Sequence, residues 1–187
     1  MKYIFEYASP LGKIFIESDG KFLTGLWFEY SFDEKKHAEN SAGEVKKLSA
    51  DSPDLPSVIF ETCRWLDVYF SGRNPDFTPE FRIENLTPFR KLVVDEMLKI
   101  PFGATATYGG IAKNIAAKKG LEKMSAQAVG GAVGWNPICI VVPCHRVLGS
   151  NGSLTGYGGG IKNKIALLKL EGINTEKLAL PKSRKFM

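Results

Sequence analysis

Residues 138–146 read Ile-Cys-Ile-Val-Val-Pro-Cys-His-Arg. The five apolar residues 138–142 are typical of a segment that is buried on both sides, and Pro143 ends the run. Cys144 and His145 follow at once, and burying such polar groups without a purpose is costly. A neighbouring imidazole also helps a thiol to become the nucleophilic thiolate. The segment therefore predicts a cysteine nucleophile at Cys144 with His145 as its base.

Three other readings of this segment remain open. Cys139, Cys144 and His145 could bind zinc, but their spacing lacks the second ligand pair of structural zinc sites. A redox pair would need a Cys-x-x-Cys motif, and a cysteine peptidase usually separates its Cys and His widely in sequence. A buried base also needs an acceptor that orients it, and Glu171 is our candidate.

The sequence from residue 87 to residue 133 predicts three helices. Thr87 and Pro88 are an N-cap and a first-turn proline, and a second helix runs from about Thr107 to a closing Gly120. A third, short helix begins after Ser125 and carries mostly small side chains. Two helices joined by a short turn indicate a helix-turn-helix, although any helical hairpin in a core has the same pattern.

Three further features are expected in the C-terminal half. Asn151-Gly152 is the strongest hairpin signal in the chain. A last helix over residues 161–171 is expected to bury Ile161, Ile165 and Leu168 and to expose its lysines. The basic tail after Leu180 is expected to be loose.

The N-terminal half is typical of an α/β unit. Residues 3–7, 14–18 and 22–28 predict three strands separated by turn signals. We expect a mobile connection at about residues 31–56, with a short helix near residues 44–48 and a solvated His37. A helix capped by Ser57 should extend to about Phe70 with Cys63 at an ordinary core position, and a last strand is expected near residues 81–83.

Composition fits a soluble protein with one large domain or two small ones. Of the 187 residues, 44% are hydrophobic and 24% are charged, which excludes general disorder. No apolar run is long enough to span a membrane, and the acidic N-terminus argues against a signal peptide. Three cysteines are too few for a disulfide scaffold, so a reducing, cytoplasmic location is expected.

Charge divides the chain into an acidic and a basic half. Residues 1–86 contain 10 Lys/Arg and 15 Asp/Glu, whereas residues 87–187 contain 15 and 5. This asymmetry suggests that the second half meets a polyanion, although a solvated lysine-rich face would have the same composition. We therefore place domains at 1–86 and 87–187.

Residues 140–147, Ile-Val-Val-Pro-Cys-His-Arg-Val, resemble the active-site motif of the O6-alkylguanine-DNA alkyltransferases, also called methylated-DNA–protein-cysteine methyltransferases. The resemblance covers about residues 87–173. Further matching segments stand in family order: Pro101-Phe102-Gly103, Tyr108-Gly109, residues 128–132, Asn136-Pro137, Gly156-Tyr157 and residues 167–172.

The resemblance implies a fold and a reaction. The fold would be an α/β, ribonuclease-H-like N-terminal domain followed by a mainly α, winged-helix-like domain with the helix-turn-helix. The reaction would be DNA repair by a single, irreversible transfer of the alkyl group from O6-alkylguanine to Cys144, with O4-alkylthymine as a second candidate substrate. No cofactor or metal would be needed, and the protein would act as a monomer.

The resemblance also assigns roles to residues. His145, acting through a water and oriented by Glu171, would take the proton of Cys144. Tyr108 would protonate the departing base, and Asn136 would brace the turn that holds Cys144. The pocket for the base and its alkyl group would be lined by Tyr157, Pro143, Val147 and Gly158, the last of which is Ser in some members.

Duplex DNA is the partner that the resemblance implies. The short third helix would enter the minor groove, and the damaged base would be rotated out of the stack. The residues expected to contact DNA are Ser125, Ala126, Gln127, Ala128, Gly130, Gly131 and Arg146. Gln127 stands where most members have arginine. Glutamine has neither the charge nor the planar fork of the arginine side chain. A non-catalytic lesion-binding relative and a winged-helix regulator remain alternatives, and a Cys144→Ala variant separates them.

Overall fold

The computed structural model describes residues 1–34 and 44–179, which form two compact units. The first unit contains Met1–Glu84 together with Pro137–Val141. The second contains Asn85–Asn136 and the chain from Val142 onward. The division near residue 84 lies two residues from the boundary placed by charge. His37 and the basic tail after Leu180 lie outside the described residues.

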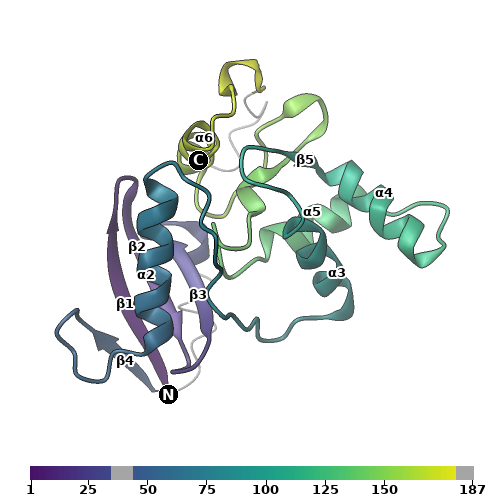
Figure 1. Ribbon diagram of the computed structural model, residues 1–187. Coiled ribbons are helices and arrows are strands. Elements are labelled where there is room, and N and C mark those ends of the chain that lie inside the picture. Colours follow the sequence, from purple (N-terminus) through teal and green to yellow (C-terminus); the bar gives the residue numbers. More distant parts are fainter. Residues whose placement is uncertain (35–43, 180–187) are drawn as a thin grey trace. The chain divides into compact units, whose positions relative to one another are not determined.

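A four-stranded sheet forms the centre of the first unit (Figure 1). Its order is β3-β2-β1-β4, and its strands are β1 (Lys2–Ser9), β2 (Gly12–Ser18), β3 (Leu23–Phe28) and β4 (Val45–Leu48). The first three strands confirm the prediction. The helix expected near residues 44–48 is wrong, because this segment pairs in parallel with β1, Lys2 opposite Val45 and Phe5 opposite Leu48. Such a partner is far away in sequence and leaves no local signal.

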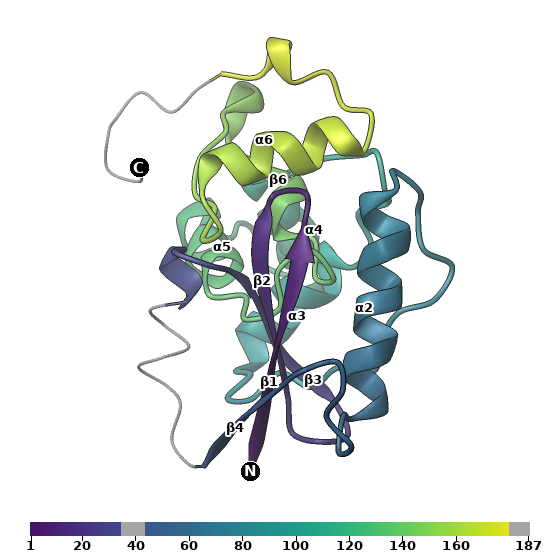
Figure 2. The same cartoon turned by 90° about the vertical axis from the view of Figure 1, so that its left-hand side faces the viewer.

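Helix α2 (Ser57–Phe70) packs along one face of this sheet, as Figure 2 shows. The pairing of the strands places Tyr7, Ile14 and Phe28 side by side on that face, and the Tyr7 hydroxyl donates to Asp67 of α2 at 2.7 Å. The predicted helix is confirmed, but Ser57 is its first residue and not its cap. Pro56 precedes it, and no side chain caps the helix.

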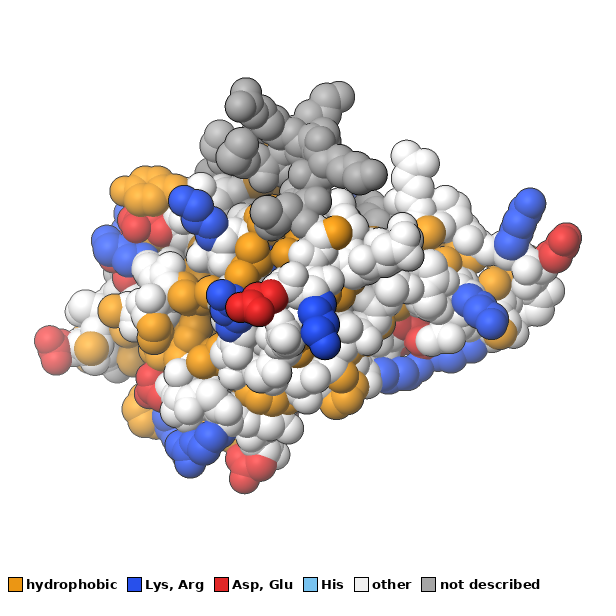
Figure 3. All heavy atoms as spheres, turned by 90° about the horizontal axis from the view of Figure 1, so that it is seen from above, with side chains coloured by type: hydrophobic (Ala, Val, Ile, Leu, Met, Phe, Trp, Pro, Cys, Tyr) orange, Lys and Arg blue, Asp and Glu red, His pale blue; other side chains and the backbone are white. Residues whose placement is uncertain are grey.

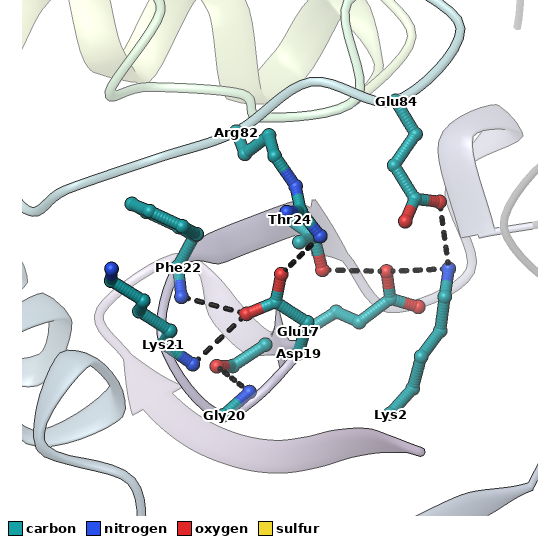
Figure 4. Close-up of polar contacts among 10 residues, drawn as sticks. Lys2, Glu17, Asp19, Gly20, Lys21, Phe22, Thr24, Arg82 and Glu84 are labelled. Carbon is teal, nitrogen blue, oxygen red and sulfur yellow. Dashed lines mark hydrogen bonds and ion pairs between the residues drawn. The ribbon is translucent and has the colours of Figure 1, made fainter.

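A polar cluster closes one end of the sheet (Figure 4). Glu17 is 2% exposed, and its carboxylate accepts from Lys2 Nζ at 3.0 Å and from Thr24 Oγ1 at 2.9 Å. Asp19 accepts from two backbone N–H groups of its own turn and from Arg82 Nη2 at 2.5 Å. Arg82 lies beyond an isolated bridge between Leu23 and Phe81, which is all that forms of the strand expected near residues 81–83.

Residues 137–141 return to the first unit from the second half of the chain. The carbonyl of Pro137 accepts from Leu26 N at 2.9 Å, and Cys139 N donates back to the Leu26 carbonyl at 2.9 Å. Ile138 and Cys139 are 0% and 1% exposed, so the predicted burial of the run is correct. This segment of the C-terminal half thus joins the first unit and forms an isolated bridge, Ile138 opposite Leu26, with β3 at the edge of the sheet.

Three mutually packed helices build the helix-turn-helix part of the second unit. These are α3 (Pro88–Met97), α4 (Tyr108–Lys119) and α5 (Ala126–Gly134). The Thr87 cap prediction is confirmed, because its side chain accepts from Arg90 N. The side chains of Thr107 and Ser125 cap α4 and α5 in the same way, accepting from Gly110 N and Ala128 N. Gly120 ends α4 in the left-handed conformation. The predicted pair of helices joined by a short turn is therefore confirmed.

Glu96 of α3 ties α3 to α4. It is 5% exposed, and its carboxylate accepts from Lys99, from Lys118 and, at 3.0 Å, from Asn114. Burial raises the pKa of Glu96, but these three donors outweigh burial and bring that pKa to about 2. The carboxylate therefore remains charged between the two helices at neutral pH.

The rest of the second unit supports the segment after Cys144. A two-stranded parallel pair joins β5 (Ala106–Thr107) to β6 (Val147–Leu148), and α6 (Ile161–Leu170) packs on the turn η1 (Cys144–Arg146). The Asn151-Gly152 signal gives a turn closed by Gly149 N and the Ser153 carbonyl at 2.8 Å, but its flanks do not form a hairpin of strands. Among the helices of residues 1–34 and 44–179, none is long and apolar enough to cross a bilayer.

Candidate active site

Two tight turns position Cys144. Val141 N donates to the Cys139 carbonyl at 2.7 Å across Ile140, and Cys144 N donates to the Val142 carbonyl at 2.8 Å across Pro143. Pro143 has φ −81° and ψ 60°, which are the angles of an inverse γ-turn, and its ring fixes φ there. Ile140 has φ 65°, which is rare and strained for a β-branched residue. The surrounding packing therefore holds a strained path that ends at the thiol.

Asn136 holds the end of this path. Its Nδ2 donates to the Val142 carbonyl at 2.9 Å and to Cys144 Sγ at 3.1 Å, and both residues are buried, Cys144 being 6% exposed. A hydrogen bond to the sulfur favours its thiolate form over its thiol form. This is the position in which the resemblance places Asn136.

His145 and Glu171 form a buried pair beside Cys144. His145 Nε2 lies 2.7 Å from Glu171 Oε1, and their side chains are fully buried. Burial lowers the pKa of His145 from 6.5, and although Glu171 acts in the other direction, burial prevails. The ring is therefore neutral at pH 7. With Nε2–H donating to the carboxylate, Nδ1 is the nitrogen that can accept a proton.

Glu171 remains ionised in this buried place because of its partners. Burial raises its pKa, but His145 and Arg146 outweigh burial and bring it to about 2. Gly103 N also donates to Oε2 at 3.1 Å. Gly103 has φ 77°, and a Cβ there would lie 3.1 Å from the Glu171 carbonyl, which explains the glycine of the Pro-Phe-Gly segment.

The prediction that Arg146 contacts DNA conflicts with its place in the structure. Its side chain is nearly buried, and Nε and Nη2 donate to Glu171 at 2.9 and 3.0 Å. Nη1 donates to the Ile100 carbonyl at 2.7 Å. A buried carboxylate needs a counter-ion, and Arg146 supplies it here. The guanidinium therefore belongs to the support of the His145–Glu171 pair.

Tyr108 and Tyr157 lie close to the same centre. The Tyr108 hydroxyl donates to the Thr155 carbonyl at 3.0 Å, and burial, with a contribution from the Cys144 charge, raises its pKa to about 12. Gly156 has φ 63°, and a Cβ on it would lie 3.3 Å from this hydroxyl. Tyr157 is 7% exposed and meets His145 edge-on, with ring centroids 6.4 Å apart. The structure thus brings together Asn136, Cys144, His145, Glu171 and both tyrosines.

The remaining pocket candidates have mixed surroundings. Pro143 makes the γ-turn, Val147 is 0% exposed inside the unit, and Gly158 is half-buried. The Val147 side chain is therefore part of the core. Among the described residues, no group of three or more His, Cys, Asp or Glu side chains could hold a metal ion. Cys139 is 1% exposed in the core of the first unit, whereas Cys63 of α2 is half-buried, and burial raises the pKa of Cys63 to about 12.

Helix α5 presents a face of small and polar side chains. Only Val129, Ala132 and Val133 of this helix are buried. The exposed positions are Ser125, Ala126, Gln127, Ala128 and Gly131, and Gly130 is half-buried. Lysines Lys113, Lys118, Lys119 and Lys123 lie on α4 and in the turn that follows, and Figure 3 shows cationic side chains spread over that end of the unit, at the right of the view.

The sequence analysis missed one residue of this region, Lys164. It was counted among the exposed lysines of the last helix, but its side chain is 0% exposed. A signal was present, since Lys164 follows Ile161 by three residues and precedes Leu168 by four, which places it on the apolar face. Lysine is so seldom fully buried that composition overrode the periodicity.

This fold and site define a two-unit protein with a helix-turn-helix and a buried cysteine held by an amide and a histidine–glutamate pair. Residues 88–173 match the family described as 6-O-methylguanine DNA methyltransferase, DNA binding domain, and residues 1–83 match its ribonuclease-like domain. The chain belongs to this family of methylated-DNA–protein-cysteine methyltransferases. The predicted ribonuclease-like fold of the N-terminal half is thereby confirmed.

Similar proteins agree over nearly the whole chain. The methylated-DNA–protein-cysteine methyltransferase of Methanosarcina acetivorans is 40% identical over 167 residues, covering 89% of this chain and 96% of the relative. The one from Mycobacterium tuberculosis is 38% identical, with 87% and 88% covered. A crystal structure of the M. tuberculosis protein in complex with DNA superposes with a TM-score of 0.72 at 35% identity, covering 95% of each chain.

Proposed function

We propose that this protein repairs DNA by moving the alkyl group of O6-alkylguanine to the sulfur of Cys144, once per molecule. The observation that carries this proposal is the position of Cys144 Sγ, 3.1 Å from Asn136 Nδ2 and next to the neutral His145 that Glu171 orients. The names of the relatives and their DNA complex support the same reaction. The protein is accordingly a single-turnover methylated-DNA–protein-cysteine S-methyltransferase.

The transfer begins with loss of the thiol proton. His145 accepts that proton, through a water, while Glu171 stabilises the imidazolium that forms. The thiolate then attacks the alkyl carbon in line with the O6–C bond. A carbon–sulfur bond forms, the O6–C bond breaks, and its electron pair stays on the guanine. The carbon–sulfur bond of the thioether product is stable, because thiolate is a poor leaving group from an alkyl carbon and the protonated guanine is too weak a nucleophile to attack it, so each molecule acts once.

Tyr108 would supply the proton that the departing guanine needs. Its pKa of about 12 keeps the hydroxyl protonated at neutral pH, so the group is available as an acid. The hydroxyl rests on the Thr155 carbonyl until a base enters. Pro143, which precedes Cys144, and Tyr157, whose ring meets that of His145, would form the wall against which the alkyl group packs.

DNA would be bound through α5 in the minor groove. That groove is narrow, about 6 Å wide, and admits a helix only where its side chains are small, as Ala126, Ala128 and Gly131 are. The α4 lysines would meet phosphates without reading sequence, as suits lesions that occur anywhere. The damaged base would leave the stack to reach Cys144, and Gln127 would take its place opposite the orphaned base. The protein would act as a monomer in the cytoplasm.

Mass spectrometry tests this proposal directly. The pure protein is incubated with a duplex that contains O6-methylguanine, its intact mass is measured, and the modified peptide is mapped. We expect one added methylene on Cys144 and none in a Cys144→Ala variant. An unchanged mass with the DNA still bound would indicate a lesion-binding relative or a regulator instead.

A further inference from the structure

Lys164 of α6 is a fully buried cation for which the transfer steps above have no use. Its side chain is 0% exposed. The ammonium donates to the Val147 carbonyl at 2.6 Å and to the Thr155 carbonyl at 3.1 Å. Burying a lysine without a carboxylate partner is expensive, and a methionine or leucine would pack there at lower cost. A residue held at that cost is a candidate for a role in the reaction.

One carbonyl links Lys164 to Tyr108. The Thr155 oxygen accepts from Lys164 Nζ at 3.1 Å and from the Tyr108 hydroxyl at 3.0 Å. The Val147 carbonyl, which Lys164 also holds, belongs to β6 directly after the Cys144–Arg146 turn. The ammonium thus connects β6, which follows the Cys144–Arg146 turn, to Thr155, whose carbonyl accepts the hydrogen bond of the Tyr108 hydroxyl.

The charge of Lys164 also acts on Cys144. Burial lowers the pKa of Lys164 from 10.5 to about 8, while a negative charge on Cys144 acts in the opposite direction. Such an interaction is mutual, so a protonated Lys164 favours the thiolate of Cys144. This electrostatic interaction exists only while Lys164 keeps its proton.

We propose that Lys164 is a positioning residue of the transfer reaction: its ammonium group fixes the Val147 and Thr155 carbonyls, and with them the Tyr108 hydroxyl, and stabilises the Cys144 thiolate by its charge. This proposal rests on the proposed function. It adds a group that acts through Tyr108 and Cys144 and does not touch the alkyl group.

The proposal implies a loss of activity at alkaline pH. As the pH rises through about 8, Lys164 loses its proton, and both the carbonyl contacts and the charge weaken. The other groups that face it keep their state over this range. Tyr108 of α4 has its pKa at about 12, His145 is already neutral because burial lowers its pKa, and Glu171, with its pKa at about 2, stays charged. Ionisation of the Cys144 thiol would raise the rate with pH, so a fall above about pH 8 points to Lys164.

The test compares Lys164→Met with Lys162→Met. Both replace a lysine of α6 by a side chain of similar length, but Lys162 is exposed. Single-turnover transfer to an O6-methylguanine duplex is measured between about pH 7 and pH 9, together with DNA affinity. We expect Lys164→Met to transfer about tenfold more slowly at pH 7, as a shift of one unit in thiolate formation implies. Its alkaline fall should disappear, with DNA affinity unchanged. Lys162→Met should match the parent in all three.

A second readout does not depend on DNA. The rate at which iodoacetamide modifies Cys144, followed by peptide mapping, should become half-maximal at a higher pH in Lys164→Met. This readout remains valid if the parent transfers no methyl group, so the two proposals can fail separately. Parental reactivity of Cys144 together with a parental pH profile in Lys164→Met would overturn the proposal. If Lys164→Met does not fold, a parent rate that stays level or rises to pH 9 would overturn it equally.

Discussion

At the scale of single residues, the site depends on groups that hold Cys144 from several directions. Asn136 divides its amide between a carbonyl and the sulfur, and Pro143 sets the turn between them. Neither residue reacts, yet both decide where the sulfur lies. The motif predicts the nucleophile and its base from sequence, whereas the two acceptors of Asn136 could be seen only in three dimensions.

Replacing Asn136 by Ala should affect both stability and reactivity. The buried Val142 carbonyl would lose its side-chain donor, which costs about 1–3 kcal/mol. The thiolate would lose a hydrogen bond, so iodoacetamide modification of Cys144 at pH 7 should slow by about tenfold. Urea unfolding and alkylation rates measure the two effects. Asn136→Asp keeps the shape but replaces the donor by a negative charge beside the sulfur, so alkylation should be slower still than in Asn136→Ala. Unchanged alkylation in both variants would contradict the role of the amide.

Replacing Glu171 by Gln should destabilise the protein in a pH-dependent way. The change leaves Arg146 buried without its counter-ion, which costs about 3–5 kcal/mol. The folded-state pKa of Glu171 is about 2 and lies below the unfolded value of about 4.3. Its contribution is therefore complete above about pH 5 and is lost as the pH falls toward 2. The difference in unfolding free energy between parent and variant should be smaller at pH 3 than at pH 7. An equal difference at both pH values would show that the carboxylate charge is not responsible.

At the scale of elements, local signals were sufficient where both ends of a helix are marked in sequence. Helix α4 runs from Tyr108 to Lys119, directly between its N-cap Thr107 and its C-cap Gly120. They were insufficient for β4, which exists because β1 offers it a partner. The same limit applies to residues 138–142, where burial was predicted from composition but the two tight turns were not. Turns across Ile140 and Pro143 depend on the packing around them.

The junction of α3 and α4 can be tested at Glu96. Glu96→Gln removes the charge that binds Lys99 and Lys118 but leaves room for the Asn114 contact. Both lysines are about half exposed, so solvent weakens the pairs, and we expect a loss of only about 1–2 kcal/mol at pH 7. Asp95→Asn is the matched control, because Asp95 pairs with Lys91 on the surface of the same helix. Loss of this exposed pair should lower the free energy of unfolding by only about 0.3 kcal/mol. Equal losses in both variants would remove Glu96 as the tie between the helices.

At the scale of the whole molecule, charge and motif predicted the function better than they predicted the exact contacts. The basic half of the chain does contain the helix-turn-helix and the cysteine site. Arg146 and Lys164 nevertheless belong to the interior of that half and not to its surface. A count of cations cannot distinguish a buried counter-ion from a surface charge, because that distinction depends on neighbours far away in sequence. DNA binding by the second unit is therefore best tested on the exposed face of α5, the helix proposed to enter the minor groove.

Gln127 is the position at which to test that binding. Gln127→Arg adds a cation with a planar fork on an exposed helix face, and Gln127→Lys adds charge without the fork. Each should raise affinity for duplex DNA at low salt, and one further phosphate contact would steepen the salt dependence by about one unit. If Gln127 occupies the place of the extruded base, only the arginine variant should also accelerate transfer. Unchanged binding in both variants would exclude Gln127 from the DNA-contacting surface.

The return of residues 137–141 to β3 has a consequence for exchanging parts between relatives. A chimera made by a single cut near residue 84 would combine the sheet of one parent with an edge segment of the other. Leu26 would then meet a foreign partner for its two backbone bonds, and the foreign Ile138 and Cys139 positions would have to fit a core that did not evolve with them. The segment also leads directly into the turns that carry the nucleophile. A working hybrid would therefore need two further junctions, one on each side of residues 137–141, so that these five residues come from the same parent as the N-terminal sheet.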